Sequence, residues 1–147
     1  MSASGNPPLA GAAATPVHFE FAWAPAHRRA NRLFGVTPAR TWVDVDWGTL
    51  DAHFGRWQLI TPLSNITAVK ITGPYKFLKV AGPPRLGITD LGITFATNCR
   101  QGALLTFRDK VAAIDPFGIF RHPELTVTVA DIDAFVRLIR DRAELTA

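Results

Sequence analysis

The sequence predicts a mainly β protein, an antiparallel barrel or sandwich of about seven or more strands closed by a C-terminal helix, with a short basic helix near the N-terminus. Short runs of alternating apolar and polar residues recur along the chain and are separated by Gly and Pro turns. Near the C-terminus, by contrast, apolar residues recur at the i, i+3, i+4 and i+7 spacing of an amphipathic helix. Strands alternating with long helices are missing, which argues against a doubly wound sheet.

Length and composition indicate one globular domain. The chain has 147 residues, of which 48% are hydrophobic and 19% charged, and its net charge is +4. Residues 1–15 are rich in Ala, Gly and Pro and contain no Lys or Arg, so we expect a flexible tail rather than a signal peptide. Residues 16–147 then form the domain.

The single cysteine, Cys99, excludes an intramolecular disulfide and a Cys-based zinc site. No run of about 18 apolar residues exists that would predict a transmembrane helix. A reducing compartment fits this cysteine usage, so we expect a cytoplasmic protein.

The N-terminal part predicts a strand, a basic helix and a second strand. Residues 17–23 alternate, with the aromatic residues at 19, 21 and 23 on one face. Residues 26–34 fit a short helix ended by Gly35, and it carries Arg28, Arg29 and Arg32. Residues 41–47 alternate again. We expect Val43, Val45 and Trp47 on the inner face and Trp42, Asp44 and Asp46 on the outer face.

The middle and C-terminal parts predict further strands. We expect them at 50–54, 56–61, 66–72 and 76–81, separated by turns at Gly55, Pro62 and the Gly73–Pro74 pair. Residues 93–97 and 103–108 fit a hairpin around 98–102, and 111–114 and 125–129 fit two more strands. The last helix, 131–142, begins at the N-cap Asp131 and presents an apolar face: Ile132, Phe135, Val136 and Ile139.

Three segments carry a family resemblance: VDVDWGTLDAHFG at 43–55, TPLSNITAV at 61–69 and LTVTVADIDAFVRLI at 125–139. They resemble the opening hairpin, the following strand and the closing strand and helix of bacterial pleckstrin-homology-like (PH-like) domains, and the Ala/Arg-rich style resembles uncharacterised actinobacterial proteins. The resemblance implies two antiparallel sheets closed by a helix, and a role in binding phosphoinositides, peptides or proteins. The basic signature of phosphoinositide binders is missing, because the first hairpin is acidic, with Asp44, Asp46 and Asp51.

The strand and helix before Thr41 depart from the PH-like pattern and leave open a START-like helix-grip fold. That fold expects a longer final helix, and its function would be to bind or act on an apolar small molecule in a cavity of at least about 300 Å³. A third reading is an accessory protein that docks on a partner through Phe117 and Phe120, two rings in a loop rich in Pro and Gly.

No pattern in the sequence predicts catalysis, a metal site or a cofactor. His18, His27, His53 and His122 lack metal-ligand spacing, and no P-loop or nucleophile elbow is present. We interpret Asp44 and Asp46 as a charged outer sheet face and Cys99 as an inert thiol at a hairpin tip. We therefore expect a non-enzymatic protein.

The strongest functional pattern is a basic stretch with interleaved aromatic residues. No acid occurs between Asp51 and Asp90. This stretch predicts a basic sheet edge that binds a protein segment or an anionic lipid headgroup, although lysines on an edge strand also protect against aggregation. Nucleic acid is not expected, because an RNP-type motif is missing. The predicted binding residues are Lys70, Tyr75, Lys76, Lys79 and Arg85, joined by Arg28, Arg29 and Arg32.

Overall fold

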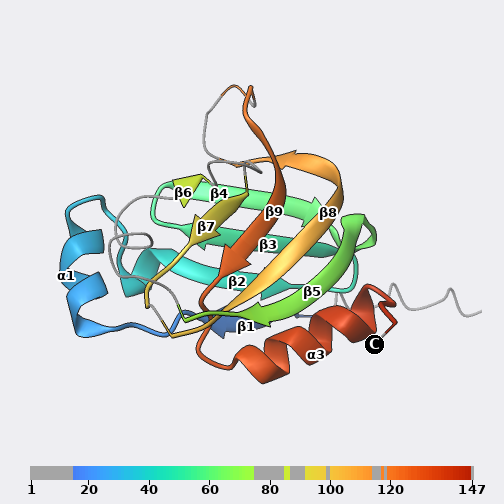
Figure 1. The fold of residues 1–147 in the computed structure, drawn as a ribbon, viewed down its shortest axis with the longest axis horizontal. Helices are drawn as coiled ribbons and strands as arrows, with labels where there is room; N and C mark the ends of the chain where they lie inside the picture. Colours follow the sequence, from blue (N-terminus) through green and yellow to red (C-terminus); the bar gives the residue numbers. More distant parts are fainter. Residues whose placement is uncertain are drawn as a thin grey trace, which may run out of the picture.

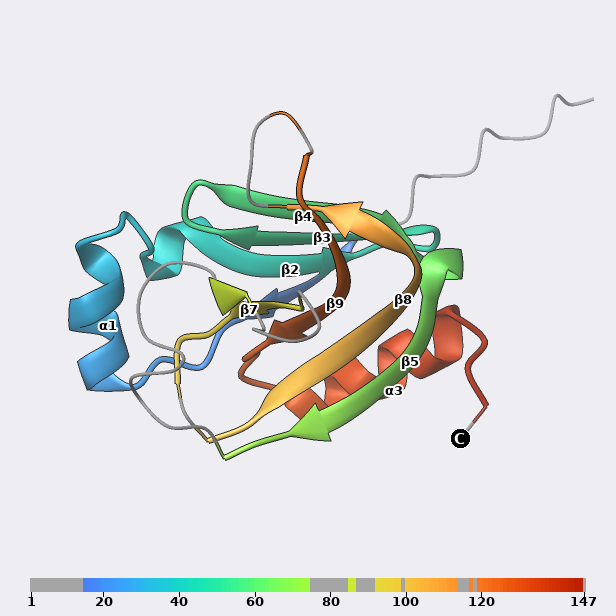
Figure 2. The ribbon, with the colours of Figure 1, turned by 45° about the horizontal axis from the view of Figure 1, so that its top comes forward.

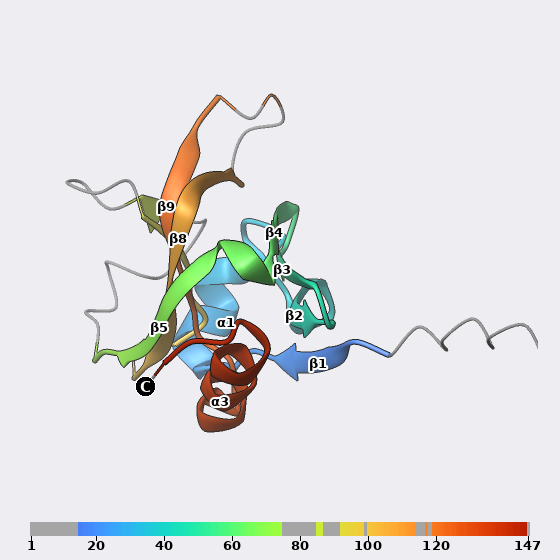
Figure 3. The ribbon, with the colours of Figure 1, turned by 90° about the vertical axis from the view of Figure 1, so that its right-hand side faces the viewer.

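The computed structural model describes residues 15–74, 85–86, 92–98, 100–113, 117 and 119–146, with the main chain alone at 85–86. These residues form two β-sheets that face each other across a hydrophobic core. In Figure 3, β5, β8 and β9 of one sheet lie apart from β1, β2, β3 and β4 of the other. The prediction of a mainly β protein with a C-terminal helix is confirmed. The predicted flexible tail lies, except for Thr15, outside the described residues.

The first sheet contains four antiparallel strands in the order β1-β2-β3-β4. They are β1 (Val17–Glu20), β2 (Thr41–Val45), β3 (Thr49–Phe54) and β4 (Trp57–Pro62). Alternate residues point into the core as the pattern predicted, and Val43, Val45 and Leu50 have no exposed surface. The prediction that Trp47 lies on the inner face is wrong, because 68% of its surface is exposed. The strand ends at Val45, and the Asp46 carboxylate accepts the N–H groups of Gly48 and Thr49, which turns the chain before Trp47 can reach the core.

The second sheet contains five strands in the order β5-β8-β9-β7-β6. They are β5 (Ile66–Thr72), β6 (Arg85–Leu86), β7 (Ile93–Phe95), β8 (Gly102–Ala112) and β9 (Arg121–Val127). The predicted hairpin between 93–97 and 103–108 is wrong: β7 pairs in parallel with β9, and β9 separates it from β8. The chain between β7 and β8 therefore crosses the end of β9. Thr97 is held at this crossing, because its N–H donates to Thr128 Oγ1 at 2.8 Å and its hydroxyl donates to the Ala22 carbonyl.

Within the described part of the chain the two sheets do not close into a barrel, and the strands are not all antiparallel, which corrects the barrel alternative. The 3₁₀ turn η2 (Leu63–Asn65) carries the chain from β4 in one sheet to β5 in the other. The Asn65 side chain fixes this corner, because its amide donates to the Asp109 carbonyl at 2.9 Å and its carbonyl accepts the Asp109 N–H at 2.8 Å.

Two helices cover open sides of this arrangement. The helix α3 (Ile132–Arg142) runs between the sheets beside β5, and α1 (Pro25–Arg32) lies at the end of the molecule, followed by the 3₁₀ turn η1 (Pro38–Arg40) (Figures 1 and 2). The predicted N-cap is confirmed, since the Asp131 carboxylate accepts the Ala134 N–H at 3.2 Å. The predicted apolar face of α3 is also buried. None of the helices in the described residues has the length and apolar character needed to span a bilayer.

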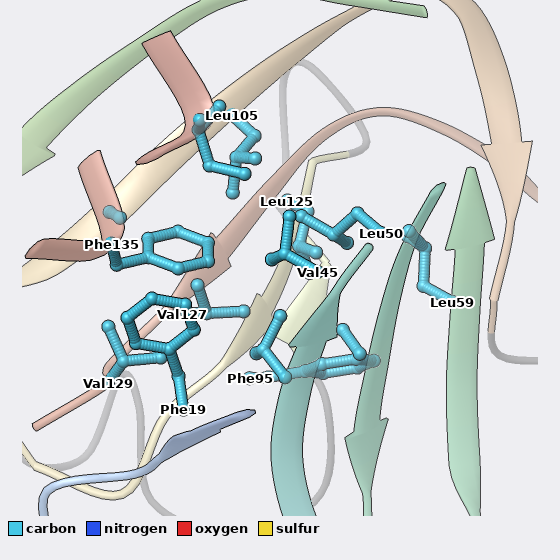
Figure 4. Close-up of a cluster of buried hydrophobic side chains, with 14 of the residues drawn as sticks. Phe19, Val45, Leu50, Leu59, Phe95, Leu105, Leu125, Val127, Val129 and Phe135 are labelled. Atoms are coloured by element: carbon cyan, nitrogen blue, oxygen red, sulfur yellow. The ribbon is translucent and has the colours of Figure 1, made fainter. Parts of the chain in front are cut away.

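Aromatic side chains fill the space between the sheets. Phe54 of β3 stacks on Phe95 of β7 with ring centroids 5.0 Å apart, and both rings are fully buried. Phe19 of β1 meets Phe135 of α3 edge to face at 5.1 Å, so the helix shares the same core (Figure 4). These direct ring contacts join β3 to β7 and β1 to α3 within one hydrophobic core.

Candidate binding surfaces

The predicted basic edge is not brought together as one surface. Lys70 is exposed on β5, and β6, which contains Arg85, lies at the opposite edge of the five-stranded sheet. Tyr75, Lys76 and Lys79, with the predicted strand 76–81, lie outside the described residues, as does Cys99. The two described members of the stretch are therefore separated by the width of the sheet.

The helix α1 presents the remaining predicted arginines to solvent. Arg28, Arg29 and Arg32 are exposed, whereas His27 and Asn31, four residues apart, face the core. Asn31 fixes the helix in place, because its side-chain N–H donates to the Ala96 carbonyl at 3.1 Å. Burial lowers the pKa of His27, so its imidazole is neutral near pH 7.

A pocket of about 500 Å³ lies at the start of α1. It is lined by Trp23, Asn98 and Arg100, among other residues from 22–25, 100–101 and 129–130. The Asn98 side chain links two segments of the pocket lining. Its amide N–H donates to the Ala22 carbonyl at 2.9 Å, and its side-chain oxygen accepts the Arg100 backbone N–H at 2.9 Å.

Sequence reasoning did not find this pocket. Its lining comes from three segments, and only the fold brings them together. The alternation at 17–23 predicts only a strand position for Trp23, and no pattern in the sequence singles out Arg100. The available signal is the polar character of Thr97, Asn98, Arg100 and Gln101, which fits a hairpin turn equally well.

A second hollow, of about 520 Å³, lies between β1 and α3. It is open to solvent and is lined by the strand from Val17 to Glu20 and by residues of α3 and its N-terminal approach, including Asp131 and Leu138. It is a surface groove beside the last helix and does not extend into the core between the sheets.

The outer face of the first sheet carries a polar network. The His18 Nδ1 lies 2.6 Å from an Asp44 carboxylate oxygen, and the Gln58 amide donates to Asp51 at 2.9 Å. The His53 ring stacks on Trp42 with centroids 4.3 Å apart.

The outer-face prediction thus holds for Asp44, whereas Asp46 acts as the turn cap already described. Asp44 lies directly opposite Asp51 in the sheet, and each carboxylate is bound by a neighbouring side chain. Among the described residues there is no group of three or more His, Cys, Asp or Glu that could hold a metal ion.

The loop before β9 exposes its rings, with 84% of Phe117 and 58% of Phe120 accessible. This exposure is what the docking-loop alternative requires.

Comparison of the chain with protein-family models, with curated proteins and with solved structures found no match.

Proposed function

We propose that the chain is a non-enzymatic binding module of PH-like architecture that recognises an anionic lipid headgroup at the end of the molecule formed by α1. The site is the pocket containing Trp23, Asn98 and Arg100, together with the exposed arginines of α1. The observation that carries this proposal is the position of Arg100 in a pocket of about 500 Å³ beside an arginine-bearing helix.

The chemistry of the pocket favours an anion. A guanidinium presents several N–H donors in one plane, a geometry that matches phosphate and carboxylate oxygens. The pocket adjoins the N-terminus of α1, where the N-cap Ala24 makes no side-chain hydrogen bond, so the positive end of the helix dipole adds to the attraction. Arg28 lies one helical turn after Ala24 and adds positive charge on the same side of the helix.

The packed core supports a surface binder over a START-like cavity protein. A cavity for an apolar ligand would occupy the space between the sheets, and the fully buried, stacked rings of Phe54 and Phe95 take up part of that space. The groove beside α3 is open to solvent and carries two carboxylates, Glu20 and Asp131, which suits an enclosed apolar ligand poorly.

Co-sedimentation with vesicles tests the proposal. The protein is compared on phosphatidylserine-rich and pure phosphatidylcholine vesicles at low and high salt. We expect binding to anionic vesicles only, because each cation near an anionic surface contributes about 1 kcal/mol and salt screens that attraction. The variants Arg100→Ala and Arg28→Ala/Arg29→Ala/Arg32→Ala should each weaken binding, the triple variant by at least about tenfold.

A matched control keeps the charge change constant. The variant Lys70→Ala/Arg108→Ala/Arg137→Ala removes three exposed cations from β5, β8 and α3. Equal loss in this control would mean that net charge, and not the α1 end, governs binding. A further variant, Lys76→Ala/Lys79→Ala/Arg85→Ala, tests the basic stretch. If it alone abolished binding, the site would belong to that stretch and the α1 assignment would be wrong.

A further inference from the structure

The strand β1 is an open edge of the first sheet. The register of β1 against β2 places His18 opposite Asp44. At the end of β2, the Asp46 N–H donates to the carbonyl of Thr49 in β3. Even-numbered residues of β2 therefore direct their backbone N–H and C=O groups toward β3. By the alternation of antiparallel ladders, Val17 and Phe19 pair with β2, and the N–H and C=O of His18 point away from it. Within the described part of the chain, no backbone group pairs with His18 on that side.

The chain itself begins to pair with this edge and then stops. The Ala130 N–H donates to the Glu20 carbonyl at 2.8 Å, and the Ala22 N–H donates to the Thr128 carbonyl at 2.9 Å. These two bonds flank an antiparallel bridge between Phe21 and Val129. Asp131 then turns the chain into α3, so among the described residues no strand lies beside the rest of the β1 edge.

The space along this open edge is the groove of about 520 Å³ described above. On one side lies the β1 edge and on the other the surface of α3 at Ala134 and Leu138. Val17 is 37% exposed and offers an apolar contact at the start of the groove. An extended segment placed there would have backbone partners at His18 and apolar contacts at Val17 and Leu138.

The charge of the groove defines its occupant. Glu20 and Asp131, both exposed, line it, and no Lys or Arg is among its described lining residues. The strands β1 to β4 likewise carry no Lys or Arg, although the whole chain is basic. Opposite charge across an interface guides the encounter and sets the register of a partner.

We propose that the groove between β1 and α3 binds a short extended segment of a partner protein, in which Lys or Arg alternates with aliphatic residues, as an added strand on the edge of the first sheet. Its backbone pairs with His18, its aliphatic side chains contact Val17 and Leu138, and its cations lie near Glu20 and Asp131. This site adjoins the anion pocket, with which it shares Ala130, but it does not include Arg100.

The probe is the blocked peptide acetyl-Lys-Val-Lys-Val-Lys-Val-amide, titrated into the full-length protein by calorimetry. We expect binding that is at least about tenfold tighter than that of the same peptide with Glu in place of Lys. The amide hydrogen of His18 should exchange more slowly in the complex, because it becomes a strand hydrogen bond. Unchanged exchange at His18 would overturn the proposal even if the peptide bound.

Two variants at one position separate backbone pairing from side-chain contact. His18→Pro removes the outward N–H and is tolerated on an edge strand, whereas His18→Ala removes only the imidazole and its contact with Asp44. We expect His18→Pro to abolish binding, His18→Ala to retain it, and Glu20→Lys to weaken it. Circular dichroism and thermal unfolding show whether each variant is folded.

A peptide N-methylated at alternate residues gives an independent test that needs no protein variant. The residues opposite His18 carry their side chains on the same face as Glu20, so in the proposed pose the Lys N–H groups face β1. The peptide N-methylated at its Lys residues should therefore not bind, whereas the peptide N-methylated at its Val residues should. Affinity of the Lys-methylated peptide equal to that of the parent peptide, or no affinity for the parent peptide, would overturn the proposal. A dimer in sedimentation that is lost in His18→Pro would assign the edge to a second copy of this chain and would overturn it as well.

Discussion

At the scale of single residues, Arg142 joins the last helix to the turn after β2. Its guanidinium Nη1 donates to the carbonyls of Val45 at 2.8 Å and Asp46 at 2.9 Å, and it lies over the Trp47 ring at 4.4 Å from the centroid. The contact gives the exposed Trp47 a packing partner outside the core. One side chain thus satisfies two carbonyls at the end of a strand and covers an indole.

Arg142→Ala should lower the free energy of unfolding by about 1–3 kcal/mol, since hydrogen bonds from a charged donor and a cation–π contact are lost together. Urea unfolding measures the loss, and the nuclear magnetic resonance signal of the Trp47 indole N–H reports the change at that ring. Arg137→Ala, at an exposed position of the same helix, is the control and should change stability by less than about 0.5 kcal/mol. Equal effects would contradict the assignment.

His27 links stability to pH. Burial holds the pKa of His27 below the ordinary value of 6.5, so the unfolded chain binds a proton there more readily than the folded chain does. The contribution of this residue to stability is therefore complete above pH 6.5 and is lost as pH falls toward its lowered folded value.

Urea unfolding midpoints for the wild type should accordingly decrease between pH 7.5 and pH 5.5. The variant His27→Gln should show a smaller decrease over the same interval, whatever its stability at pH 7.5. A slope that His27→Gln leaves unaltered would contradict the role of burial at this site.

At the scale of elements, the local sequence pattern correctly predicted those features of strands and helices that depend on residues close together in the chain. The strand Ile66–Thr72 has the bounds that its alternation and flanking turns indicated, and α3 begins at its cap and buries the predicted face. The strand β7 could not be paired correctly from local signals, because Thr97 joins it to Ala22 and Thr128, residues distant in sequence.

The candidate site was predictable only in part, for the same reason. The arginines of α1 lie together because a helix of eight residues carries them, and they are exposed as an outer helix face should be. The pocket brings together Trp23, Asn98 and Arg100. They meet because the chain between β7 and β8 crosses β9, and neither alternating residues nor turn residues predict that crossing. The separation of Lys70 from Arg85 likewise follows from the order of strands, a property of the whole sheet.

The cap of α3 gives a prediction at this scale. Asp131→Ala should cost about 0.5–2 kcal/mol, because the Ala134 N–H loses its acceptor and the helix dipole loses its nearby negative charge. Asp131→Asn keeps an acceptor and should recover a substantial part of that cost. Thermal unfolding of the three proteins checks it, and equal melting temperatures would contradict the role of the cap.

At the scale of the whole molecule, the two sheets are held together by apolar contact across the core. Phe54 and Phe95 stack from opposite layers, and Phe135 brings α3 into the same cluster through Phe19 (Figure 4). A packed core fixes the relative position of the layers and therefore the shape of the surface pocket at their end.

Phe95→Ala should lower the free energy of unfolding by about 3–5 kcal/mol, the usual cost of deleting a buried phenyl ring. Ile60→Ala, on the exposed side of β4, is the comparison and should change stability little. Chemical denaturation followed by far-ultraviolet circular dichroism measures both. A cost below about 1 kcal/mol for Phe95→Ala would mean that the core relaxes around the gap and that packing between the layers is loose.

The most direct test of the central claim is a titration of the ¹⁵N-labelled protein with a soluble anionic headgroup, glycerophosphoserine, followed by amide and indole chemical shifts. The anion-site assignment predicts that the largest shifts fall on the Trp23 indole and on the backbone of Asn98, Arg100 and the first turn of α1, and that Arg100→Ala abolishes them. Shifts centred instead on Lys70, Arg108 or the β1–α3 groove, or no saturable shifts, would contradict an anion site at the α1 end.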